Sequence, residues 1–280
     1  MNASDPKAEQ LAYWSGPVGE RWAAWQPILD RALAPFADRL VSAAALKSGE
    51  RVLDVGCGCG VTTLLASTAV GSTGSIVGVD LSAPMVERAR SLSSGRGNIH
   101  YVLTDAAVED FDKSFDVALS RFGIMFFDDP VAAFRNLHAA LVPGGRIAFA
   151  CWRSLAENDW ARVPREVTAR FVTATGPWKA DGPGPFSLAD RARIESILEQ
   201  AGFSKIAVDP FDADVVMSED GAAGAVEFAT SVGPASALLR EASPETKTAV
   251  RAALLETFSA FGKGAELALP GAIWIVRASK

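Results

Sequence analysis

The sequence predicts an α/β protein with a doubly wound, mostly parallel sheet. Between about residues 46 and 151, apolar runs of strand length alternate with segments of helical spacing, as in parallel sheets covered by helices on both faces. A glycine-rich turn, residues 56–60, joins the first predicted strand to the first helix. The 280 residues are 49% hydrophobic and 21% charged, which is ordinary for a globular protein with a large core.

Seven strands are expected, five before residue 151 and two near the carboxyl end. The predicted strands are 51–55, 75–79, 99–103, 115–120, 146–151, 205–209 and 272–277. The predicted helices are 62–68, 84–91, 130–141, 159–173, 190–200, 222–233 and 244–261. We expect a single domain over residues 1–280 with a ligand-binding core at 46–151. The segments 152–186 and 214–269 are too long for simple connections, so we expect them to form walls of a pocket.

Residues 1–45 carry helical spacing and many aromatic side chains. The apolar residues from Pro27 to Leu46 fit helical periodicity. Aromatic residues in such segments usually pack onto the core. The alternative is a helical lid over a small molecule, in which Tyr13 or Trp22 contacts the ligand.

Composition argues against several partners. The net charge is -6 and there is no basic tract, which disfavours binding to nucleic acid. No apolar run approaches the roughly 20 residues that span a bilayer, and the first residues lack the pattern of a secretion signal. Three cysteines indicate reduced thiols in a cytoplasmic setting. Oligomeric state is not predicted.

The residues at the carboxyl ends of the first two predicted strands indicate a nucleoside site. Ligands of open α/β sheets lie at the carboxyl ends of the strands, and glycine at 56, 58 and 60 lets a ligand approach the backbone. Asp80 ends the second strand, where a carboxylate can accept hydrogen bonds from a ribose diol. The alternative role for Asp80 is a helix cap, although Ser82 is better placed for that.

The spacing of the glycines favours one kind of nucleoside. A nicotinamide dinucleotide site has Gly-x-Gly-x-x-Gly, with a pyrophosphate on the helix amino end. Here the glycines are Gly56, Gly58 and Gly60, and Asp54 precedes them. Because a carboxylate repels a pyrophosphate and attracts an ammonium group, S-adenosylmethionine fits better.

Five motifs in order resemble those of the class I S-adenosylmethionine-dependent methyltransferases, specifically the group similar to ubiquinone- and menaquinone-pathway enzymes. They are residues 52–60, Val79–Ser82 with Met85, Thr104–Ala106, Phe115–Ser120 and Leu141–Arg146. The resemblance covers about residues 46 to 151. It implies a Rossmann-like sheet of seven strands in which the last strand is antiparallel.

The resemblance also implies the cofactor site. Asp54 and the glycine turn would hold the methionine moiety, Asp80 the ribose, and Asp105 with Ala106 the adenine. The expected cofactor-binding residues are Asp54, Gly56, Cys57, Gly58, Gly60, Asp80, Leu81, Met85, Asp105, Ala106, Ser120 and Arg121.

The acceptor side is less defined. His100 and His138 do not fall at strand exits, so we expect structural roles for both. Tyr13 and Arg121 are better placed for contact with substrate or cofactor, and no general base is identified. The expected pocket residues are Tyr13, Trp22, Phe122 and Trp152. The polar residues Arg153, Glu157, Asn158 and Asp159 follow the fifth strand; each is expected on the surface, and the alternative is that some of them face the pocket.

Metal ions and nucleobases are not expected at this site. Cys57 and Cys59 have no second ligand pair, and Asp129 before Pro130 is explained as a helix cap. The Asn-Pro-Pro-Tyr signature of nucleobase amine methyltransferases is absent after the fourth strand.

The sequence thus predicts a cytoplasmic methyltransferase acting on a small organic acceptor, with methylation at oxygen, nitrogen, carbon or sulfur left open. Two alternatives remain: a catalytically silent module that binds the cofactor, and a nicotinamide-dependent dehydrogenase.

Overall fold

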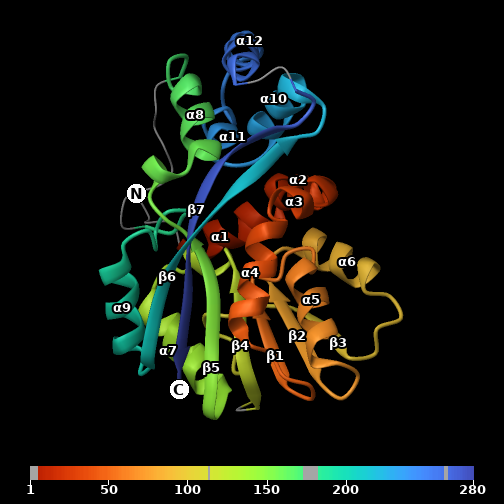
Figure 1. The fold of residues 1–280 in the computed structure, drawn as a ribbon, viewed down its shortest axis with the longest axis vertical. Coiled ribbons are helices and arrows are strands. Elements are labelled where there is room, and N and C mark those ends of the chain that lie inside the picture. The colour runs from red at the N-terminus through yellow and green to blue at the C-terminus, as the bar shows by residue number, and fades with distance from the viewer. Residues whose placement is uncertain (1–5, 113, 173–181, 262–263) are drawn as a thin grey trace.

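The fold is a seven-stranded sheet with helices on both faces (Figure 1). The computed structural model describes residues 6–112, 114–172, 182–261 and 264–280. The strand order is β3-β2-β1-β4-β5-β7-β6. Strands β1 to β5 are parallel, and β7 pairs antiparallel with both β5 and β6. The predicted Rossmann-like sheet with an antiparallel last strand is therefore confirmed.

The strands match the predicted alternation closely over the first half of the chain. Their bounds are β1 Arg51–Val55, β2 Ser75–Asp80, β3 Ile99–Leu103, β4 Phe115–Arg121, β5 Leu141–Trp152, β6 Ser204–Ser218 and β7 Leu267–Ser279. The last three are longer than predicted. Since β6 and β7 pair from Ser204↔Ser279 to Ser218↔Leu267, residues 214–218 and 267–269 belong to this ribbon rather than to an insertion.

The helices fall into three groups. Helices α4, α5 and α6 contact one another or the strands on one side, and α7 and α9 contact each other and strands β5 and β6. The remaining helices gather beyond the carboxyl ends of the parallel strands (Figure 1). The bounds are α1 Pro6–Ser15, α2 Pro17–Ala24, α3 Gln26–Ala32, α4 Ala34–Ala44, α5 Val61–Val70, α6 Ala83–Leu92, α7 Pro130–Ala140, α8 Asp159–Thr168, α9 Arg191–Gln200, α10 Gly221–Ser231, α11 Pro234–Leu238 and α12 Pro244–Ala260, with 3-10 turns η1 Ile124–Phe126 and η2 Leu155–Glu157. Residues 173–181 of the predicted segment 152–186 lie outside the described residues.

The segment from Pro27 to Leu46 forms short helices, as expected for residues 1–45. It divides at Leu33 into α3 and α4, each with a proline in its first turn. Pro35 has no N–H to donate and restricts the residue before it, which explains the break. Phe36 on α4 is fully buried and packs edge-to-face on Trp152 at 5.2 Å.

The predicted cap of α7 is confirmed, because the Asp129 side chain accepts a hydrogen bond from the Ala132 N–H. Helices in the described part of the chain are all too short or too polar to cross a membrane.

The turn after β1 touches the loop after β4, backbone against backbone. Gly56, Gly58 and Gly60 have φ of 65°, 54° and 88°, which glycine adopts without steric penalty. A Cβ on Gly56 would lie 2.6 Å from the Gly123 Cα, and one on Gly123 would lie 2.7 Å from the Gly56 Cα. Two glycines are therefore required where these loops meet.

We expect Gly123→Ala to lower the free energy of unfolding by about 1–3 kcal/mol, because the added methyl group overlaps the Gly56 backbone. Urea denaturation measures the change. Gly97→Ala is the matched control, since a Cβ there meets nothing within 4 Å. Equal stability of the two variants would contradict the close contact.

Candidate functional site

A cavity of about 380 Å³ lies at the carboxyl ends of the central strands. Its walls come from the N-terminal helices, from the loops after β1, β2, β3 and β4, and from the segments after β5 and β6. The strand order places Asp80 and Asp105, after β2 and β3, at one end of the cavity, which we call the polar end, and Phe122 and Trp152, at the ends of β4 and β5, at the other, which we call the apolar end. This combination is typical of a small-molecule site.

Asp80 lies on the cavity wall and ties two loops together. Its Oδ2 accepts a hydrogen bond from the Gly58 N–H at 2.8 Å, and its Oδ1 accepts one from the Ser82 N–H at 2.8 Å. Burial raises the pKa of Asp80, and these backbone donors oppose the rise. The expected capping role of Ser82 is wrong, because its hydroxyl makes no cap hydrogen bond and is buried without a partner among the residues that the structure describes.

The loop after β3 forms the next part of the polar end. Asp105 and Ala106 line the cavity, beside Leu81 and Met85. The Asn136 amide donates to the Ala106 carbonyl oxygen at 3.1 Å, which fixes this loop against α7. The predicted adenosine residues are therefore brought together on one wall.

Asp54 lies behind the glycine turn rather than on the cavity wall. It is 0% exposed, and its Oδ2 accepts a hydrogen bond from the Thr63 hydroxyl at 2.6 Å. Its Oδ1 is buried without a partner among the described residues. Burial raises the pKa of Asp54 to about 6, while Thr63 and the Arg121 charge oppose the rise.

The turn itself borders the cavity through Gly56, Cys57, Gly58 and Cys59. Gly60 is not part of this lining. Instead, a Cβ at Gly60 would lie 2.4 Å from the Tyr101 hydroxyl oxygen. Burial raises the pKa of Cys59 to about 12, so its thiol stays protonated at neutral pH. No group of three or more metal-ligating side chains occurs within the described ranges.

The two residues at the end of β4 differ in role. The Ser120 hydroxyl is buried and donates to the Val55 carbonyl oxygen at 2.7 Å, so it joins β4 to β1 rather than facing the cavity. Arg121 lines the cavity, and its Nε and Nη1 are buried without hydrogen-bond partners in the described chain. Burial lowers the pKa of Arg121, and the charges of Asp30 and Asp54 oppose this.

Two polar cavity residues on α3 were not predicted. Gln26 and Asp30 both line the cavity, and the Gln26 amide donates to the Asp30 carboxylate. The Gln26 Oε1 accepts from the Nε and Nη2 of Arg88 at 3.2 and 3.0 Å. A polar pair one helical turn apart within an aromatic-rich segment is the signal that could have indicated them.

The apolar end contains three of the four predicted pocket residues. Trp22, Phe122 and Trp152 line it, and the Phe122 ring stacks on Trp152 at 4.3 Å with an interplanar angle of 5°. Phe122 has a φ of 67°, an uncommon conformation for a residue with a side chain. The Phe122 N–H donates to the Ala150 carbonyl oxygen at 3.0 Å, which helps to hold it.

Tyr13 lies beside this cavity rather than in its lining. It borders a smaller cavity of about 50 Å³, which shares Trp14 and Trp22 with the larger one. The Arg240 guanidinium lies 4.9 Å from the centre of its ring, and burial raises the pKa of Tyr13. Of the two histidines, His100 is exposed and His138 packs edge-to-face on Phe203.

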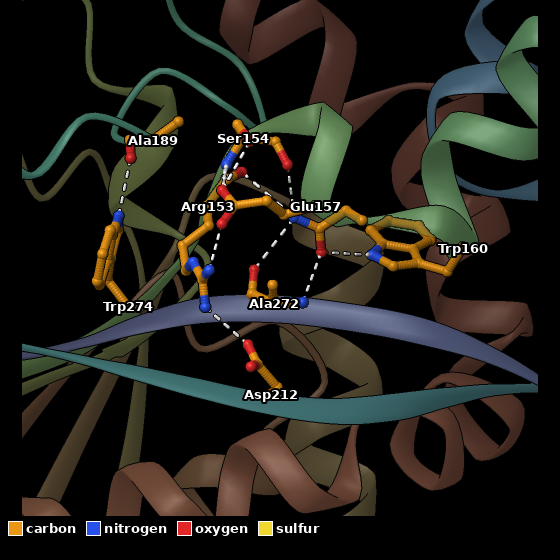
Figure 2. Close-up of polar contacts among 9 residues, drawn as sticks. Arg153, Ser154, Glu157, Trp160, Ala189, Asp212, Ala272 and Trp274 are labelled. Atoms are coloured by element: carbon orange, nitrogen blue, oxygen red, sulfur yellow. Dashed lines mark hydrogen bonds and ion pairs between the residues drawn. The ribbon is translucent and has the colours of Figure 1, made fainter.

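A polar network after β5 positions another wall residue, Trp160. The Trp160 indole donates to the Asn158 Oδ1 at 3.2 Å, and the same oxygen accepts from the Ala272 N–H at 2.9 Å. Nearby, Arg153 bridges Glu157 and Asp212 (Figure 2). Asn158 is 0% exposed, so the expectation of a surface role is wrong for this residue.

We expect Asp54→Asn to raise the free energy of unfolding by roughly 1–3 kcal/mol at pH 7. A carboxyl group whose pKa is higher in the folded state than its ordinary 3.8 disfavours folding when ionised. This cost is absent below about pH 4 and complete only above about pH 6, so the difference should develop between these values. Urea denaturation across pH measures it. The exposed Asp110→Asn is the control, and a lower stability of the Asp54 variant at pH 7 would contradict the analysis.

Comparison with known proteins identifies the family. The methyltransferase domain family matches residues 52–145. Aklanonic acid methyltransferase DauC of Streptomyces sp. (strain C5) is 39% identical over 118 residues, covering 41% of this chain and 54% of DauC. A demethylmenaquinone methyltransferase of Staphylococcus aureus (strain JH9) is 34% identical over 186 residues, covering 63% of this chain and 77% of that protein. The chain thus spans about half of DauC and about three quarters of the staphylococcal enzyme.

A solved structure supports the fold. Phosphoethanolamine N-methyltransferase 2 of Haemonchus contortus, in complex with phosphomonomethylethanolamine and S-adenosylhomocysteine, superposes with a TM-score of 0.59 at 18% identity. The match covers 99% of this chain and 60% of that one. The sequence relatives lead to one conclusion: the chain belongs to the class I S-adenosylmethionine-dependent methyltransferases, in the group related to the menaquinone-pathway enzymes.

Proposed function

We propose that the protein transfers a methyl group from S-adenosylmethionine to a small, flat and largely apolar organic acceptor. The observation that carries the proposal is a single cavity with two different ends. Asp80 and Asp105 line the polar end, whereas Trp22, Phe122 and Trp152 line the apolar end. One cavity of this kind can hold the donor and the acceptor side by side.

The polar end suits the adenosine and methionine parts of the donor. Asp80 would accept hydrogen bonds from the ribose hydroxyls, since a carboxylate has lone pairs beyond the two used by Gly58 and Ser82. Leu81 and Met85 would pack on the adenosine, and Asp105 with Ala106 would border the adenine. The turn at residues 56–60 would lie along the methionine moiety, with Arg121 close by.

The apolar end suits the reaction itself. Methyl transfer from a sulfonium is a displacement in which alignment of the two reactants supplies much of the rate. Aromatic faces attract cations, so the rings of Phe122 and Trp152 would favour the positively charged donor. The same rings exclude water from the reacting atoms. They also favour a ring-containing acceptor over a strongly charged one.

Other sequence expectations stay predictions. The net charge of -6 supports a small molecule rather than a nucleic acid as acceptor. The three cysteines are free thiols, which supports a cytoplasmic location.

We expect wild-type protein to bind S-adenosylhomocysteine at least 10-fold more tightly than its 2′-deoxy analogue, because Asp80 would bond the ribose diol. Asp80→Ala should weaken binding of the first ligand and remove most of this preference. Titration calorimetry measures both affinities. Comparing two ligands separates loss of the diol contact from loosening of the turn. A preference that survives in the variant would refute the ribose assignment.

Turnover should be detected by mass spectrometry when the protein is incubated with S-adenosylmethionine and a panel of phenols, quinols, amines and thiols. Methylated product with any of them establishes catalysis. Tight cofactor binding without turnover across the panel would favour the alternative, a cofactor-binding module without catalysis.

A further inference from the structure

A second carboxylate faces the cavity beside the glycine turn, and it comes from the N-terminal helices. Asp30 on α3 and Arg121 at the end of β4 both line the cavity. The Asp30 charge opposes the fall in the Arg121 pKa, and the Arg121 charge opposes the rise in the Asp30 pKa. No ion pair within 4.0 Å joins them among the described residues. A positive and a negative group thus line the same cavity without forming an ion pair with each other among the described residues.

The Arg121 guanidinium has buried donors without an acceptor among the described residues. Its Nε and Nη1 are buried and make no hydrogen bond in the described chain. A buried guanidinium without an acceptor is costly, because its lost hydration is not replaced. A planar carboxylate is the group that matches guanidinium donors best. A bound carboxylate would therefore accept the unused hydrogen bonds of the Arg121 guanidinium.

Asp30 is held in a defined orientation. Arg88 on α6 donates two hydrogen bonds to Gln26, and Gln26 donates in turn to the Asp30 Oδ2. Within the described residues no donor reaches the Asp30 Oδ1. This chain of contacts fixes α3 on the core and leaves one carboxylate oxygen for a ligand cation.

Asp54, the expected ligand of the ammonium group, does not fill this role through direct contact. It is 0% exposed and is not part of the cavity lining. The charges of both Asp30 and Asp80 act on the Cys59 thiol in the glycine turn. Asp30 and Asp80 both line the cavity, but Asp80 is already bound to the backbone N–H groups of Gly58 and Ser82.

We propose that Asp30 and Arg121 bind the amino acid tail of the methyl donor from opposite sides, Asp30 at its ammonium group and Arg121 at its carboxylate. This inference rests on the proposed function, because it places S-adenosylmethionine with its tail at the glycine turn. It makes α3 part of the cofactor site. The N-terminal helices then recognise the donor as well as forming the wall next to the acceptor.

The test compares ligands that differ only in the tail. S-Adenosylhomocysteine has both charged groups, whereas 5′-methylthioadenosine keeps the adenosine and the thioether but lacks both. We expect Asp30→Asn to weaken S-adenosylhomocysteine binding by about 10- to 100-fold, measured by titration calorimetry. Affinity for 5′-methylthioadenosine should stay within about twofold, and Asp30→Glu should recover part of the loss. Asp38→Asn, an exposed carboxylate on α4, is the control and should bind both ligands as wild type does.

A third ligand separates the two partners. Decarboxylated S-adenosylmethionine keeps the ammonium group and lacks the carboxylate. Arg121→Met should leave the affinity for decarboxylated S-adenosylmethionine unchanged and lower the affinity for S-adenosylhomocysteine. Asp30→Asn should lower the affinity for both ligands.

Three outcomes would overturn the inference. Unchanged S-adenosylhomocysteine affinity in Asp30→Asn, with loss of turnover, would assign Asp30 to the acceptor. If Asp30→Asn lowers the affinity for 5′-methylthioadenosine as much as that for S-adenosylhomocysteine, Asp30 only supports the packing of α3. Equal loss of decarboxylated S-adenosylmethionine affinity in Arg121→Met would contradict the carboxylate contact. Failure of the wild-type protein to bind S-adenosylhomocysteine would instead refute the proposed function itself.

Discussion

The contact between Gly56 and Gly123 is the constraint on which the site depends. It brings the turn after β1 against the loop after β4 with no side chain between them. The flanking strands are joined by the hydrogen bond from the Ser120 hydroxyl to the Val55 carbonyl oxygen. With the two loops in contact, Arg121 and Phe122 at the end of β4 both line the cavity. Backbone packing thus sets where these two side chains reach the cavity.

Buried charge is the second organising feature. Asp54, Asp80 and Arg121 lie near one another, and burial shifts the pKa of each toward its neutral form. Asp80 accepts hydrogen bonds from backbone N–H groups, but Asp54 and Arg121 each keep buried atoms without partners in the described part of the chain. Buried polar atoms without a hydrogen-bond partner lower the stability of the folded protein. Their presence at a cavity is consistent with a site that a charged ligand completes.

Much of the fold and of the cofactor side was predictable, because its signals are local. The strands β1 to β4 follow from short apolar runs, and the turn at residues 56–60 follows from its glycines. The position of Asp80 follows from its place at a strand exit. Boundaries were less predictable where tertiary contacts override local patterns. The long pairing of β6 with β7 and the break at Leu33 are of this kind.

Side-chain direction was the main obstacle at the site. Asp54 and Ser120 sit in matching motifs, yet the structure turns both away from the cavity. Tyr13 and Trp22 belong to the same aromatic segment, but only Trp22 lines the larger cavity. Gln26 and Asp30 lie outside the five sequence motifs that indicated the cofactor site. Their approach to the glycine turn depends on how α3 docks against Arg88 of α6, a contact between residues 62 positions apart.

The sequence alone determined the sheet, the glycine turn and the class of cofactor, because strand periodicity, glycine conformation and a carboxylate at a strand exit are properties of short segments. Only the tertiary structure decided which charged groups reach the ligand. That choice depends on where α3, the end of β4 and the segment after β5 meet, and these contacts join residues from distant parts of the chain.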